Sequence, residues 1–143
     1  MSAINKFSES STRLMCREFK ACEKTFDVWI YIDENQSPWF KASDVANALG
    51  FDAYSLDSHS RSFAAILANV DLGDRIELGE MIEKSSIPVP PSPWNSTTIL
   101  INEIGVHDLV FASNTSTTKP FKHWIKHDVL PYLRLIKDQK YNK

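Results

Sequence analysis

The sequence predicts a single α+β domain in which a small, mostly antiparallel sheet packs against several short helices. A chain of 143 residues, 43% of them hydrophobic, can bury one core but is too short for two ordinary domains. Residues 26–32 alternate between apolar and polar side chains, which is typical of a half-buried strand. Apolar residues at helical spacing near 45–49 and 121–125 indicate short amphipathic helices.

The first predicted element is a β-hairpin with strands at residues 19–21 and 26–32 and a turn at residues 22–25. Because side chains alternate between the two faces of a strand, we expect Val28 and Ile30 to face the core. The polar residues 1–14 are expected to be disordered, the domain to cover 15–138, and 139–143 to form a basic tail.

A short helix is expected after the hairpin. Ser43 is the predicted N-cap, because its hydroxyl can accept a hydrogen bond from a free amide of the first turn. Asp44 would place negative charge at the positive end of the helix dipole. Gly50 is the predicted stop, since glycine takes the left-handed conformation at little steric cost.

A second helix, over residues 56–69, would follow Gly50 at the spacing of a helix-turn-helix. That spacing recurs by chance, and Arg61 is the one firm cation of the segment. We therefore treat Arg61 as a secondary nucleic-acid contact.

Residues 70–78 are predicted to form a strand, and residues 80–96 a loop that contains four prolines. The spacing of Pro88 and Pro91 matches a Pro-x-x-Pro peptide ligand, but no Lys or Arg flanks it. A semi-rigid surface loop is the simpler interpretation.

Toward the carboxy terminus, residues 97–101 are predicted to form a strand, and Asn102 to cap a helix that runs through Phe111. A polar turn at residues 112–118 leads to the last helical region. Pro131 lacks an amide donor and restricts the residue before it, so a kink or a new helix is expected there.

This last helical region has two unlike faces. Phe121, Trp124 and Ile125 share one side, and we expect them to be core residues rather than platforms for base stacking. The candidate nucleic-acid contacts are Lys119, Lys122, His123 and Lys126 on the opposite side, with Arg134 and Lys137 further along the chain.

Charge is unevenly distributed along the chain. Residues 119–143 contain six Lys and one Arg against two Asp, a net charge of +5, whereas the other 118 residues carry −7. An acidic body with a basic end fits oriented binding to a polyanion. The alternative is that these lysines only solvate the outer face of an amphipathic helix.

Several short motifs follow one another between residues 26 and 136: Pro38-Trp39-Phe40, Asp44-Val45-Ala46, Leu49-Gly50, Val70-Asp71, Asp74, Ile101-Asn102-Glu103, Gly105, Phe121-Lys122, Trp124, Val129-Leu130-Pro131 and Arg134. Their order resembles the BRO-N domain, the amino-terminal module of baculovirus repeated-ORF proteins that also occurs in phage antirepressors. The resemblance implies a small α+β domain that binds DNA in many family members.

No catalytic residue, cofactor site or metal site is predicted. The chain has no glycine-rich phosphate loop or nucleophile elbow, and Asp71 and Asp74 are better explained as turn residues. His123 and His127 are spaced for metal binding on a helix, but no third ligand is evident and lysines adjoin them. The two cysteines, Cys16 and Cys22, are expected to be free thiols.

The sequence therefore predicts a non-enzymatic domain that binds DNA, duplex or single-stranded, through the basic carboxy-terminal helix. No apolar segment long enough to span a membrane and no signal peptide is evident, so we expect an intracellular protein, in the host nucleus or cytoplasm if it is viral. Two alternatives stay open. One is a protein-interaction module, antirepressor-like or with an acidic docking surface, whose partner is a host or viral protein, and the other is a truncated family member that has lost DNA binding.

Overall fold

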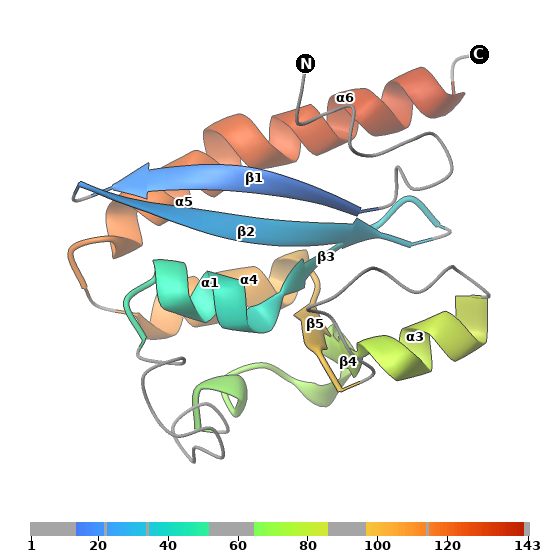
Figure 1. Cartoon of the computed structure of the whole chain (residues 1–143), viewed down its shortest axis with the longest axis horizontal. Helices are drawn as coiled ribbons and strands as arrows, with labels where there is room; N and C mark the ends of the chain where they lie inside the picture. The colour runs from blue at the N-terminus through green and yellow to red at the C-terminus, as the bar shows by residue number, and fades with distance from the viewer. Residues whose placement is uncertain are drawn as a thin grey trace.

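The computed structural model describes residues 14–21, 23–33, 35–51, 65–85, 97–113 and 115–141, and the side chains of 82–85 and 137–141 are not among the described parts. The predictions for residues 1–13, for Arg61 and for the proline-rich residues 86–96 lie outside this part of the chain. Within it, a five-stranded antiparallel sheet packs against short helices, which confirms the predicted α+β class (Figure 1).

Strands β1 (Leu14–Ala21) and β2 (Lys24–Ile32) form the predicted hairpin, with Phe19 opposite Phe26 and Ala21 opposite Lys24. The turn is shorter than expected: it contains residues 22 and 23, and Glu23 has a φ of 64°. Two-residue hairpin loops require positive φ, because only then does the turn match the twist of the strands. Strand β1 begins at Leu14, which we had expected in a disordered segment, and Val28 and Ile30 are fully buried as predicted.

The strand order is β1-β2-β3-β5-β4, with β3 at Pro38–Lys41, β5 at Ile99–Ile101 and β4 at Arg75–Glu77. The predicted strand over residues 70–78 was wrong in its extent. A 3-10 helix η3 (Leu72–Asp74) precedes β4, and helix α3 (Leu78–Ser85) follows it where we had expected a loop from residue 80. Leu78 and Met81 lie three residues apart and are both buried against the sheet, so tertiary burial favours a helix over the loop.

The sheet is covered on both faces. Helices α1 (Ala42–Ala48) and α4 (Glu103–Ala112) lie side by side on the face of Phe19, Val28 and Phe40 (Figure 1). Helices α5 (Thr118–Trp124) and α6 (Leu130–Tyr141) run along the β1–β2 hairpin (Figure 1). On the other face, α3 packs over a smaller cluster formed by Leu14, Tyr31, Leu78, Met81 and Leu100. The larger core therefore lies between the sheet and the helices that carry the candidate site.

Helix α1 begins earlier than predicted, and the assignment of Ser43 as N-cap was wrong. Strand β3 runs directly into the helix, so Lys41 is the N-cap residue and Ser43 lies inside the first turn. Asp44 is buried, and its Oδ2 accepts a hydrogen bond from the backbone N–H of Trp29 at 3.0 Å. Gly50, with a φ of 90°, ends the α1 region as predicted.

Asn102 caps helix α4 as predicted. Its Oδ1 accepts from the backbone N–H of Gly105 at 2.9 Å, and its Nδ2 donates to Asp74 Oδ1 at 3.0 Å. The helix ends at Ala112, one residue later than expected. The same side chain thus caps α4 and holds it against η3.

Candidate nucleic-acid interface

The predicted basic region is one continuous helical rod built from three elements. Helix α5 (Thr118–Trp124) continues into a π-helical turn, η4 (Ile125–Val129), and then into α6 (Leu130–Tyr141). The N–H of Leu130 donates to the carbonyl of Ile125, which is five residues earlier, whereas an α-helix would use the carbonyl four residues earlier. The new helix begins at Leu130, immediately before Pro131, as predicted.

The apolar side of α5 anchors the rod to the hairpin. Phe121 is fully buried, Ile125 is 1% exposed and Trp124 is 9% exposed. The Phe19 ring lies 5.2 Å from the ring of Phe121, edge to face, and 5.1 Å from that of Trp124, measured between centroids. These aromatic residues are core residues as predicted, so their faces are not available for stacking on bases.

The opposite side of α5 and η4 carries exposed cations. We call Lys119, Lys122, His123 and Lys126 the basic ridge, and all four side chains are exposed. Among the described residues, no carboxylate lies within ion-pair distance of any of them. The positive charge of the ridge is therefore directed to solvent rather than neutralised by the described part of the fold.

Two histidines lie on or beside this ridge. The rings of His123 and His127 stand 4.3 Å apart between centroids, with an interplanar angle of 31°, and both are exposed. Within the described ranges, no group of three or more His, Cys, Asp or Glu side chains is placed to hold a metal ion.

The structure separates Arg134 from the basic ridge. Arg134 lies eight residues after Lys126, about 12 Å along a helix. It lines a pocket that also contains Glu103 and contains none of the ridge residues. Lys137 belongs to the backbone of α6, but its side chain is outside the described residues, as is Arg61. Of the seven predicted contacts, the structure therefore brings together the four that form the ridge.

The sequence interpretation missed Lys24. In the hairpin register Lys24 is opposite Ala21, on the same face as Phe19 and Phe26, so it points to the side on which α5 lies. The alternation that placed Val28 and Ile30 in the core could have identified Lys24. These three residues are separated by even numbers of positions and therefore share one face of the strand. Its neighbour Lys20, opposite Thr25, points to the other face.

A cluster of hydroxyl groups fixes where α5 starts. The Ser113 and Thr115 hydroxyls both donate to the Leu49 carbonyl at the end of α1, at 3.0 and 2.8 Å. The hydroxyls of Ser113 and Thr118 are 2.6 Å apart, and Thr118 Oγ1 also accepts from the backbone N–H of Thr115 at 2.9 Å. These bonds satisfy a helix carbonyl and tie the first turn of α5 to α1.

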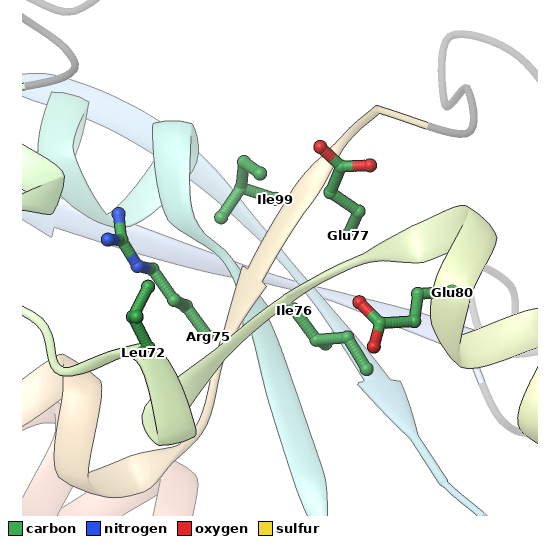
Figure 2. Close-up of a pocket in the computed structure, with 6 residues that line it drawn as sticks. All are labelled: Leu72, Arg75, Ile76, Glu77, Glu80 and Ile99. Carbon is green, nitrogen blue, oxygen red and sulfur yellow. The ribbon is translucent and has the colours of Figure 1, made fainter.

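A second surface of a different character lies at the edge strand β4. A pocket of about 360 Å³ is lined by Leu72, Arg75, Ile76, Glu77, Glu80 and Ile99. Figure 2 shows Arg75 beside Leu72, whereas Glu80, from α3, lies near Ile76. Leu72 is 78% exposed, so this surface combines an apolar side chain with two carboxylates and one guanidinium group.

Among the described residues, no helix combines the length and apolar character needed to cross a membrane.

The family model of the BRO family, N-terminal domain, matches residues 27–131, which run from within β2 to the start of α6 and include all of the basic ridge. No curated protein and no solved structure is significantly similar to the chain. The BRO family is generally linked to DNA binding in viral and phage proteins. Since the match covers most of its length, the chain belongs to the BRO family through this amino-terminal domain.

Proposed function

We propose that this protein is a non-enzymatic DNA-binding domain that contacts phosphates through the basic ridge. The observation that carries the proposal is the exposure of Lys119, Lys122, His123 and Lys126 without an ion-pair partner among the described residues. Membership of a family linked to DNA binding supports the same function. If the protein is viral, this role would place it in the host nucleus or cytoplasm.

The geometry of the ridge favours contacts to the nucleic-acid backbone over contacts to bases. Lys119 and Lys126 are seven residues apart, about 10 Å along the helix axis, which corresponds to about three base-pair steps. The nearby aromatic residues are buried and hold α5 against the hairpin. Phosphate contacts of this kind supply affinity and orientation but carry no direct sequence information.

The salt dependence of binding tests this mechanism directly. If about four cations engage duplex DNA, the ridge lysines among them, log K should fall with log salt at a slope of about −3.6, or about 150-fold between 50 and 200 mM salt. A single-stranded probe should give a slope of about −2.8. Gel-shift or fluorescence titrations over this range measure both slopes, and an affinity that is independent of salt would contradict the proposal.

A protein-interaction role is the second candidate function, and the pocket at β4 favours it. The pocket is lined by the exposed Leu72 and, at another part of its lining, by Glu77 and Glu80, which suits a partner segment that carries both an apolar and a basic side chain. Leu72→Asp should weaken such a complex and leave the salt dependence of DNA binding unchanged. Loss of DNA binding in this variant, with the fold intact, would argue against two separate surfaces.

A further inference from the structure

We propose that a pocket at the Lys119 end of the basic ridge holds one backbone phosphate of the bound nucleic acid. Its polar lining consists of Lys24, Asn47, Thr115, Ser116 and Thr117, and we call it the phosphate pocket. This inference rests on the proposed function and adds a second contact region, on different elements, to the ridge. The pocket has a volume of about 290 Å³, which suits a single charged group better than a drug-sized ligand.

Three segments that are far apart in the sequence form the walls of the pocket. Lys24 is the first residue of β2, Asn47 belongs to the last turn of α1, and residues 115–117 precede α5. The Thr115 hydroxyl donates to the Leu49 carbonyl at 2.8 Å and lies 3.1 Å from the Thr117 hydroxyl. Two of the three walls, the 115–117 segment and the end of α1, are therefore joined by a hydrogen bond before any ligand arrives, which lowers the entropic cost of binding.

Gly50 allows the close approach of two of these walls. Its φ of 90° favours glycine, and a Cβ atom placed there would lie 2.8 Å from both Thr115 Cγ2 and Thr115 Oγ1. A larger residue would push the 115–117 segment away from the end of α1 and open the pocket.

The chemistry of the lining fits an anion. Lys24 is exposed, and neither its ammonium group nor the Asn47 amide has a hydrogen-bond or ion-pair partner among the described residues. The ammonium group and the amide N–H groups are donors of the kind that recognise phosphate oxygens. None of the described residues that line this pocket carries a carboxylate, whereas Glu77 and Glu80 line the pocket at β4, and Glu103 lines the one beside Arg134.

The position of the pocket fits a strand that also contacts the ridge. Thr117 lines the pocket, and the first ridge residue, Lys119, follows it by two positions on α5. Lys24 points to the α5 side of the hairpin, as described above. A backbone that follows the ridge from Lys126 to Lys119 would meet the phosphate pocket next, with Lys24 as an additional cation.

Substitution of Lys24 tests the inference through the salt dependence of binding. Lys24→Ala should reduce the magnitude of the slope for duplex DNA by about 0.9 and lower affinity about eightfold at 0.1 M salt, since one phosphate contact is lost. Asn47→Ala should lower affinity without changing the slope, because it removes an uncharged donor. Lys20→Ala is the matched control: Lys20 is an exposed lysine of the same hairpin that points to the opposite face, and its loss should change neither quantity.

Lys122→Ala, measured in the same series, separates the two proposals. If Lys122→Ala reduces the slope and Lys24→Ala does not, the phosphate pocket is overturned and the ridge mechanism stands. If neither variant changes the slope, the proposed function fails as well. Equal effects of Lys24→Ala and Lys20→Ala would show a general charge effect and would also overturn the pocket. Unchanged thermal unfolding of each variant establishes that the comparison is between folded proteins.

Discussion

Replacing Lys122 and Lys126 together with glutamate is expected to lower affinity for duplex DNA by on the order of 100-fold or more. The change removes two of the three ridge lysines and introduces two anions at the same positions, so attraction to phosphate becomes repulsion. Both side chains are exposed on the outer side of the helical rod, opposite the buried Phe121 and Trp124. The thermal unfolding midpoint should therefore remain close to that of the wild-type protein.

A matched control distinguishes a local effect from a change in overall charge. The double glutamate variant changes the net charge from −2 to −6. The pair Lys20→Glu and Arg75→Glu gives the same net charge, but Lys20 points to the opposite face of the hairpin and Arg75 lies on the distant edge strand β4. We expect this control pair to retain most of the affinity. Similar losses in the two double variants would mean that the ridge has no special role.

The same experiment separates the two candidate functions. The pocket at β4 contains neither Lys122 nor Lys126, so binding of a protein partner there should be unaffected by their reversal. If the double glutamate variant binds DNA as tightly as the wild type, the protein does not bind DNA through the ridge.

The parts of the fold that sequence reasoning predicted well depend on local signals. The alternation of residues 26–32 identified β2 and the burial of Val28 and Ile30, because a strand has a period of two whatever its partners are. Asn102 and Gly50 were identified from the backbone groups that helix ends leave unsatisfied. The two faces of α5 followed from helical spacing alone, and the exposure of Lys119, Lys122, His123 and Lys126 agrees with that spacing.

The errors occurred where tertiary contacts override local preference. Ser43 has the chemistry of an N-cap, but β3 continues directly into α1, and the helix starts at the buried Ala42, two residues earlier than predicted. Leu78 and Met81 gain more from burial against the second face of the sheet than from the expected extended or loop conformations. The presence of Arg134 and Glu103 in the lining of one pocket depends on how the fold brings α6 near the start of α4, which no local pattern contains.

Gly105 occupies a tightly packed position, and its φ is not positive. It lies in the first turns of α4, buried against β5 and η3. A Cβ atom at this position would lie 2.9 Å from Ile101 Cβ, 3.1 Å from Val70 Cγ1 and 3.2 Å from the carbonyl oxygen of Asp74. Two of these neighbours are a backbone oxygen and a β-carbon fixed to a strand, so neither can move away by a simple change of rotamer.

Gly105→Ala is therefore expected to destabilise the domain by about 2 kcal/mol, even though alanine favours a helix over glycine by about 1 kcal/mol. The steric cost should exceed this gain because the helix must shift away from β5, which also strains the Asn102 cap and its bond to Asp74. The midpoint of thermal unfolding should fall by about 5 to 10 °C. Gly73→Ala is the matched control, because a Cβ atom placed there would meet no described atom within 4 Å and the φ of Gly73 is not positive. The midpoint of thermal unfolding of Gly73→Ala should stay within about 2 °C of the wild type. Equal midpoints for Gly105→Ala and the wild type would mean that α4 is not packed against η3 and β5 as tightly as these distances require.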